Sequence, residues 1–405
     1  MSNKKTSWKI VRETTLGLNE QDAYKSETWR KLEYERVYHV VSANPDRNRA
    51  EAVNAFLTAF RWRWGFAREI ANVCQQIGLE KGPGSTRDLA GKLSEVCGAY
   101  ENNQYQVGIK NLRDLQELAG LTSISRCEVY ALCGHFLLID DRNEDALIDL
   151  TRAVELDEKY AWAIVSRGET YRSMEKYEAA LADYTRALEL DEKDAWIIAS
   201  RGQAYRSMEK YEEALADLNL ALELNEKLDW AFLERGLIYF CLTMFDEALA
   251  DLTRAIDLDE KFIEARLLRG AIYRKLGQFE KAVQDFTAVV NMKNANSIGL
   301  SQRAAAYNST GDFNAARVDL EQVLELSLVN AEDYYGRCLA FVLLDEPGKA
   351  LEMLKEAFRQ NAGLTRLYVK IDDLINPLRN LTEFQSLMSD YFRPSESPDR
   401  SSGII

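Results

Sequence analysis

Histidine and cysteine are the side chains of this sequence that could act as a nucleophile, a general base or a metal ligand near neutral pH. The two histidines, His39 and His135, have no partner at the short spacings typical of a metal site. Cys133 lies two residues before His135, and residues at that spacing in a helix do not share a face. We find no glycine-rich phosphate-binding motif. The sequence therefore predicts no catalytic residue, no metal site and no cofactor, and indicates a protein that is not an enzyme.

Six cysteines are scattered without a Cys-x-x-Cys pair: Cys74, Cys97, Cys127, Cys133, Cys241 and Cys338. This scatter favours reduced, mostly buried thiols in a cytosolic protein. The first ten residues, MSNKKTSWKI, lack the apolar segment of a secretory signal. No uncharged apolar stretch is long enough to span a membrane. We therefore expect a cytoplasmic location without a membrane contact.

Arginine, aspartate and tryptophan recur at a fixed spacing, which indicates recognition or structure rather than catalysis. The stretch RGETYRSMEKYEAALADY, which begins at Arg167, returns from Arg201 as RGQAYRSMEKYEEALADL. Seven blocks of this length fill 127–364 without an insertion. The twentieth position of each block is alanine: Ala146, Ala180, Ala214, Ala248, Ala282, Ala316 and Ala350. A repeat with a period of roughly 34 residues indicates a solenoid.

Each block reads as two helices joined by a turn. Small residues at positions 8 and 20 let the two helices approach closely, and aromatic residues at positions 11, 17 and 24 fill the remaining gaps. One block cannot bury its own apolar face, so neighbouring blocks must stack to cover it. The pattern therefore predicts an all-α fold of stacked helix–turn–helix repeats.

This pattern resembles the tetratricopeptide repeat, because the small, aromatic and alanine positions match in register throughout the seven blocks. The resemblance covers 127–364 of the 405 residues. It implies a right-handed superhelical solenoid with a concave groove lined by positions 2, 5, 9 and 12 of each first helix. Three positions depart from the family pattern, and one of them is the usually apolar position 7, which is arginine in six blocks. The usual tryptophan at position 4 is replaced by residues such as Ile164 and Phe232, and the usual proline at position 32 by residues such as Glu158.

Arginine at position 7 and aspartate at position 23 each occur in six of the seven blocks. The arginines are Arg167, Arg201, Arg235, Arg269, Arg303 and Arg337. The aspartates are Asp149, Asp183, Asp217, Asp251, Asp285 and Asp319. We expect these residues to pair along the helix interface as a repeated ladder of ion pairs. A catalytic site is usually unique in a chain, so we assign this recurring set a structural role.

The groove positions carry the candidate binding residues. They are Trp162, Trp196, Trp230, Glu169, Gln203, Arg172, Arg206 and Arg274. Tryptophans beside arginines are the composition of protein-binding hot spots, and arginines can pair with carboxylates of a peptide. Alternatively, each tryptophan packs on the last turn of the preceding repeat, as Trp162 would beside Tyr160. No block combines Lys at position 5 with Asn at position 9, so a carboxylate clamp for chaperone C-termini is disfavoured.

The segments that flank the blocks are also helical. Residues 1–126 read as helices over 19–42, 49–77, 87–102 and 104–119, and a degenerate repeat could cover about 93–126. Residues 365–392 read as C-terminal capping helices, because a solenoid needs a polar outer face at its end. Residues 393–405 are expected to be disordered.

An aromatic and basic cluster marks the N-terminal region: Arg61, Trp62, Arg63 and Phe66. Around it, the helix expected over 49–77 is apolar on two sides. Such a helix is typical of a layer sandwiched between others, and a self-association or partner-docking surface is the alternative.

Net charge limits the class of partner. Residues 1–126 carry 19 Lys and Arg against 15 Asp and Glu, and the rest of the chain carries 32 against 50, which gives −14 in total. So acidic an array repels nucleic acid. The sequence predicts a non-enzymatic scaffold or adaptor that binds a peptide or helix of another protein in the groove. The alternatives are an autoinhibited regulator, whose N-terminal region packs on the array, and an enzyme with its site in residues 1–126.

Overall fold

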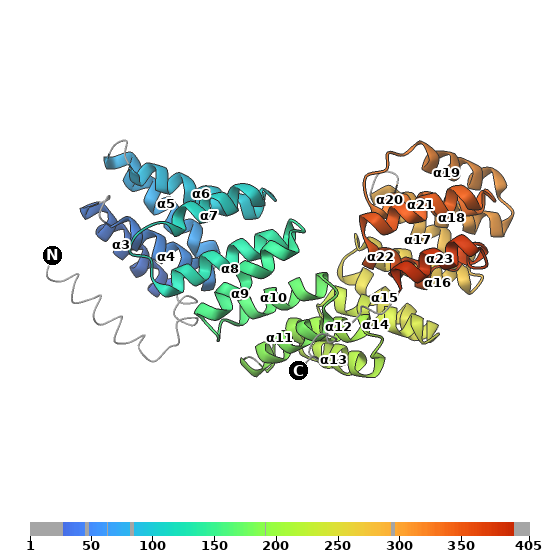
Figure 1. Ribbon diagram of the computed structural model, residues 1–405, viewed down its shortest axis with the longest axis horizontal. Helices are drawn as coiled ribbons and strands as arrows, with labels where there is room; N and C mark the ends of the chain where they lie inside the picture. The colour runs from blue at the N-terminus through green and yellow to red at the C-terminus, as the bar shows by residue number, and fades with distance from the viewer. Residues whose placement is uncertain are drawn as a thin grey trace, which may run out of the picture. The chain divides into compact units, whose positions relative to one another are not determined.

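A computed structural model describes residues 27–44, 48–62, 64–81, 85–190, 192–292 and 296–392. The fold is an all-α solenoid of helix–turn–helix repeats, as the sequence predicts (Figure 1). The chain divides into two compact units, Met1–Ala204 and Tyr205–Ile405. The tail expected over 393–405 and the first part of the helix expected over 19–42 lie outside the described residues.

In the described part of unit 1, five helices precede the full repeats. They are α3 (Glu27–Ala43), α4 (Arg49–Trp62), α5 (Trp64–Lys81), α6 (Ser85–Glu101) and α7 (Tyr105–Gln116). The prediction of one continuous helix over 49–77 is wrong, because α4 and α5 are separate helices that pack against each other. Separation lets two apolar faces, which lie on different sides of a continuous helix, turn toward one shared core.

That core joins the N-terminal helices to the first repeat. Val53 and Phe56 of α4, Ile70 of α5 and Phe136 of α8 (Ser123–Ile139) are completely buried in one cluster. The side chain of Asn54 adds two hydrogen bonds to the segment before α8, donating to the Gly120 carbonyl and accepting from the Thr122 amide, both at 3.2 Å. The N-terminal helices therefore pack as a continuation of the array.

The pair α6–α7 is built like a repeat. It turns at Asn103, which has a φ of 56°, as the first full repeat turns at Asp141 with a φ of 59°. Gly108 of α7 lies so close to α8 that an added Cβ atom would be 2.6 Å from the ring of Phe136. The spacing from Asn103 to Asp141 is longer than one repeat, so this pair falls outside the register of the full repeats.

The other helices of unit 1 belong to the full repeats. After α8 come α9 (Asn143–Leu156), α10 (Ala161–Ser173), α11 (Tyr177–Leu190) and α12 (Ala195–Ser207), which ends just beyond the unit boundary. Helices α10 and α12 begin at the first residues of their predicted blocks, whereas α8 begins four residues earlier than its block. Thr122 caps α8, accepting a hydrogen bond from the Ser125 amide at 3.1 Å, which explains the earlier start.

Unit 2 continues the repeats and ends in three shorter elements. The repeat helices are α13 (Tyr211–Leu224), α14 (Asp229–Cys241), α15 (Phe245–Leu258), α16 (Ile263–Lys275), α17 (Phe279–Met292), α18 (Ser297–Thr310), α19 (Phe313–Glu325), α20 (Ala331–Leu343) and α21 (Pro347–Gln360). They are followed by α22 (Ala362–Ile371), the 3₁₀ helix η1 (Asp373–Leu378) and α23 (Thr382–Tyr391).

The ladder of ion pairs is confirmed in four repeats. In each, the guanidinium group of position 7 donates two hydrogen bonds of 2.6–2.8 Å to the aspartate of position 23. The pairs are Arg167–Asp183, Arg235–Asp251, Arg269–Asp285 and Arg303–Asp319. Where the sequence lacks one partner, another group takes its place. Asp149 accepts from Arg113 of α7, and Arg337 donates to the Val323 and Leu326 carbonyl groups.

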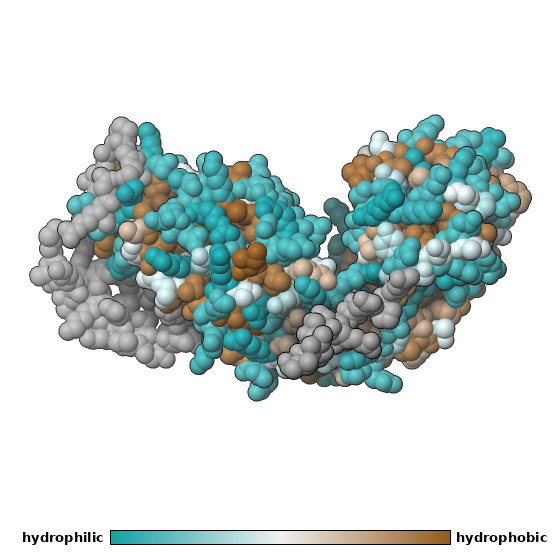
Figure 2. All heavy atoms as spheres, in the orientation of Figure 1, coloured by the Kyte–Doolittle hydropathy of each residue, from teal (hydrophilic) through white to brown (hydrophobic). Residues whose placement is uncertain are grey.

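The surface is mostly hydrophilic on the face drawn in Figure 2, and hydrophobic residues form small separate patches there. A concave site with an apolar lining therefore differs from its surroundings.

Candidate peptide-binding cavity

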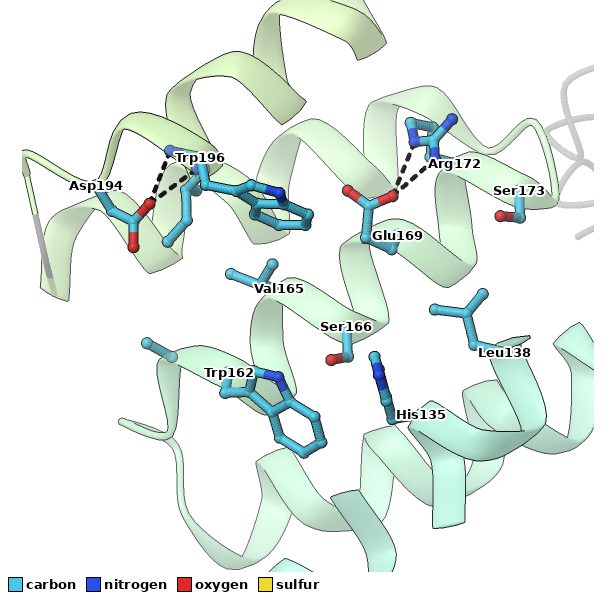
Figure 3. A pocket seen from close by; sticks show the side chains of 12 residues that line it. His135, Leu138, Trp162, Val165, Ser166, Glu169, Arg172, Ser173, Asp194 and Trp196 are labelled. Carbon is cyan, nitrogen blue, oxygen red and sulfur yellow. Dashed lines mark hydrogen bonds and ion pairs between the residues drawn. The ribbon is translucent and has the colours of Figure 1, made fainter. Parts of the chain in front are cut away.

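A cavity of about 580 Å³ opens on unit 1 between α8, α10 and α12 (Figure 3). It is lined by His135, Leu138, Ala161, Trp162, Val165, Ser166, Glu169, Arg172, Ser173, Asp194, Trp196 and Ile197. The structure thus brings together four of the candidate groove residues, Trp162, Trp196, Glu169 and Arg172.

The two tryptophans of the cavity differ in burial. Trp162 is half-buried, with its ring centroid 5.0 Å from that of His135 and 5.9 Å from that of Tyr160. For Trp162, the alternative prediction of packing on the preceding repeat is therefore confirmed. Trp196 is 42% exposed. In Figure 3 the two indole rings lie on either side of Val165.

Asp194 explains the exposed position of Trp196. Asp194 ends its block at the place where Tyr160 ends the block before Trp162, so an aspartate replaces the tyrosine there. The Asp194 carboxylate instead accepts hydrogen bonds from the Trp196 amide at 2.9 Å and the Ile197 amide at 3.1 Å. Such a cap satisfies free amides at the start of α12 and fixes the backbone that carries Trp196.

A charged pair lies at the opposite end of α10. Glu169 accepts hydrogen bonds from Nη2 of Arg172 at 2.7 Å and from Nε at 3.0 Å. Its other oxygen accepts from the Tyr184 hydroxyl at 2.5 Å. Burial raises the pKa of Tyr184, so the hydroxyl stays protonated and remains a donor. The pair is thus held in a fixed geometry, and it gives the cavity a polar end beside its apolar walls.

His135 forms part of the wall and is neutral at physiological pH. Burial lowers its pKa to about 4. Its Nδ1 atom is buried without a hydrogen-bond partner. A neutral imidazole beside Trp162 adds to the aromatic character of this wall (Figure 3).

The cavity combines apolar walls with a fixed ion pair. Burial raises the pKa of the Cys133 thiol to about 12, so it is not a nucleophile at neutral pH, and it does not line the cavity. Within the described ranges, no group of three or more His, Cys, Asp or Glu side chains could hold a metal ion. The cavity can hold an apolar group between the indoles of Trp162 and Trp196, and it has a charged pair at one end.

The other candidate groove residues are not among the lining residues of this cavity. Gln203 belongs to unit 1 but is not among the lining residues. Trp230, Arg206 and Arg274 belong to unit 2. There, Arg206 pairs with Glu234 of α14.

The second predicted interface is not described. The side chains of Arg61, Trp62 and Phe66, and the whole of Arg63, lie outside the described part of the structure.

Val165 and Asp194 line the cavity but were not among the sequence candidates. Val165 occupies position 5 of its block, one of the four positions on the concave stripe, so the periodicity of the first helix was a signal for it. Asp194 lines the cavity from the turn before α12, and the signal there is an acidic residue just before a helix.

Family models match the repeated part of the chain. Models described as TPR repeat match residues 168–208 and 202–242, and one described as Tetratricopeptide repeat matches residues 263–296. The chain is a tetratricopeptide repeat (TPR) protein. Repeats of this family mediate interactions with proteins or peptides, so the chain is an interaction scaffold. No curated protein sequence matches this TPR protein.

Solved TPR structures resemble parts of the chain. A tetratricopeptide repeat protein from Parabacteroides merdae is 22% identical, with a TM-score of 0.47, and the match covers 61% of this chain and 97% of that protein. Pseudomonas aeruginosa pilF is 19% identical, with a TM-score of 0.45, over 50% of this chain and 91% of that protein. YrrB, described as a TPR protein with an unusual peptide-binding site, is 24% identical, with a TM-score of 0.37. The match covers 50% of this chain and 96% of that protein. These likenesses concern the repeat architecture.

Within the residues that the structure describes, no helix combines the length and apolar character needed to cross a membrane.

Proposed function

We propose that this TPR protein is a non-enzymatic adaptor whose unit 1 binds a peptide segment or helix of a partner protein at the cavity between α8, α10 and α12. The ligand inserts one large apolar or aromatic side chain beside Trp196 and presents polar groups to Glu169 and Arg172. One observation carries the proposal: Trp196 remains 42% exposed at a concave, largely apolar site. Tryptophan and arginine are both enriched in binding hot spots.

The geometry of the cavity supports a ligand of this chemistry. The walls are formed by Leu138, Trp162 and Val165, so they favour an apolar side chain. The Glu169–Arg172 pair is held by three hydrogen bonds before any ligand arrives, which lowers the entropy cost of binding. A peptide bound there would lose exposed apolar area and gain directed hydrogen bonds.

The two other hypotheses from the sequence gain no support at this site. Helices α3 to α7 contribute no residue to the lining of the cavity. Their described core is shared with α8 instead, as in a further layer of the array. The described N-terminal helices therefore do not line this cavity.

A peptide selection on the full chain tests the proposal. Random peptides of one fixed length are selected on the wild-type protein, and the enriched peptides are labelled for fluorescence anisotropy. We expect the enriched peptides to share an aromatic or large aliphatic residue, and we expect Trp196→Ala to weaken their binding at least tenfold, about 1.4 kcal/mol. Phe313→Ala is the matched control, because Phe313 is a 69% exposed aromatic residue outside the cavity. Equal affinities for wild type and Trp196→Ala would reject the proposal.

A further inference from the structure

The last repeat of unit 2 is followed by a helix that faces the concave positions of the same unit. Helix α22 and the start of η1 border a cavity of about 160 Å³ with Leu364, Leu367, Tyr368, Ile371 and Asp372. The opposite side consists of first-helix residues of the repeats, including Leu233, Leu237, Leu267, Ala271 and Ile298. These five occupy positions 2, 5 or 9 of their blocks, the concave stripe that TPR arrays use for binding.

The contact ends in a pair of adjacent carboxylates that face arginine. Arg274 of α16 donates a hydrogen bond to Asp373, and its Nη2 lies 3.7 Å from Oδ1 of Asp372. Gln302 of α18 donates a further hydrogen bond to Asp372 at 2.6 Å. Two carboxylates at the C-terminal end of a helix oppose its dipole, so α22 gains nothing from them by itself. Asp372 caps η1, accepting a hydrogen bond from the Leu374 amide at 3.0 Å, and the charged and amide partners of the pair are in the groove.

A second polar contact fixes the exposed edge of α22. The Lys370 ammonium group donates to Glu209 at 2.6 Å and to the Tyr211 hydroxyl at 2.9 Å. Glu209 lies in the turn between α12 and α13, and Tyr211 is the first residue of α13. The helix is thus held at two places, at the acidic pair and at Lys370. Between these contacts lie the apolar residues of its inner face.

The apolar contact between α22 and the groove is incomplete. Leu364, Leu367 and Ile371 are only half-buried, although all three line the cavity. A pocket of about 160 Å³ that opens to solvent lies between the two surfaces. Asn361 alone separates α22 from α21, and it is the cap of both helices. Val369 of α22 is buried in one cluster with Leu354 and Phe358 of α21, so the residues that face the groove are the less closely packed part of the helix.

We propose that the concave surface of unit 2 is a second binding site, for an amphipathic helix that carries two adjacent acidic residues at its C-terminal end, and that α22 with η1 is its intramolecular competitor. The ligand would place aliphatic or aromatic residues against Leu233, Leu237 and Leu267, and its carboxylates against Arg274 and Gln302. This proposal is independent of the cavity in unit 1, since it does not use Trp196.

A labelled peptide with the sequence of residues 362–379, AGLTRLYVKIDDLINPLR, tests the proposal on the full chain. Leu367→Asp weakens the resident helix, so we expect this variant to bind the peptide at least tenfold more tightly than wild type. Adding Arg274→Glu should abolish that binding. Replacing both aspartates of the peptide by asparagine should weaken it about tenfold. Equal or absent binding to wild type and a folded Leu367→Asp variant would overturn the proposal.

Hydrogen exchange of the wild-type chain gives a second test that needs no variant. We expect amides of α22 to exchange at least tenfold faster than those of α20, and excess peptide to accelerate the exchange of α22 further. Exchange of α22 as slow as that of α20, and unchanged by the peptide, would overturn the proposal. A dimer that forms with concentration and is lost in Arg274→Glu would assign the groove to α22 of a second copy, and would also overturn it.

Discussion

The guanidinium group of Arg303 holds the carboxylate of Asp319 by two hydrogen bonds, from Nε at 2.8 Å and from Nη2 at 2.7 Å. Nη1 of the same arginine donates to Oγ1 of Thr287, in the preceding repeat, at 3.1 Å. The arginine and aspartate side chains are 15% and 5% exposed. This ion pair therefore joins the two helices of one repeat and also links that repeat to its neighbour.

Removing the arginine should destabilise the array. Arg303→Ala leaves Asp319 buried without its counter-charge, so we expect the free energy of unfolding to fall by about 3 kcal/mol. Arg317→Ala is the control, because Arg317 is 73% exposed and its pairing with Glu321 should contribute less than about 0.5 kcal/mol. Urea unfolding followed by circular dichroism measures both variants. A similar loss in the two would show that the ladder is not a stabilising element.

A turn residue offers a stabilising substitution. Thr243 has a φ of 60°, and Gly277 occupies the same position of the next repeat with a φ of 72°. Left-handed backbone is costly for a β-branched residue, so we expect Thr243→Gly to stabilise the protein by about 1 kcal/mol. The reciprocal change Gly277→Thr should destabilise it by a similar amount. Thermal unfolding measures both changes. A lower melting temperature for Thr243→Gly than for the wild type would contradict the prediction that the left-handed turn favours glycine.

His135 should make stability depend on pH. Burial lowers the pKa of His135 to about 4, so its imidazole stays neutral at pH 5.5 in the folded chain. In the unfolded chain the same imidazole gains a proton below about pH 6.5. Stability is therefore lost as the pH falls from 6.5 toward 4. We expect a loss on the order of 1 kcal/mol at pH 5.5 from this group, and expect His135→Leu to remove it. The test compares wild type and variant by urea unfolding at pH 7.5 and 5.5, and equal losses would exclude His135 as the cause.

We expect substitutions of Trp162 and Trp196 to affect stability differently. Trp162 packs on His135 and Tyr160, so Trp162→Ala should cost roughly 2 kcal/mol of stability. Trp196→Ala should stay within about 0.5 kcal/mol of wild type, because its ring is 42% exposed. Chemical denaturation of the two variants measures this difference. A large loss of stability for Trp196→Ala would mean that this indole is structural.

Much of the fold was predictable because the repeat places each residue type at a fixed position. The pairs Arg167–Asp183 and Arg235–Asp251 follow from positions 7 and 23, since a helix–turn–helix brings these positions together in every block. The split between α4 and α5 was not predictable from periodicity, because both segments are helical and apolar and no proline separates them.

The site was predictable only in part. The residues at positions 2, 9 and 12 indicated a groove, and two tryptophans with Glu169 and Arg172 do line one cavity. Which tryptophan stays exposed depends on its neighbour, Tyr160 in one case and Asp194 in the other. The contact between Arg274 and Asp372 could not be predicted, because α22 lies outside the repeated blocks and the two residues are far apart in the sequence.

The most direct test of the central claim uses ¹⁹F NMR of the full chain labelled with 5-fluorotryptophan, with the Trp196 resonance assigned through Trp196→Phe. On addition of a peptide selected on the wild-type protein, we predict that the largest shift belongs to Trp196, that Trp162 shifts less, and that Trp230 does not move. A peptide that binds while the Trp196 resonance stays in place would contradict the assignment of the cavity between α8, α10 and α12 as the binding site.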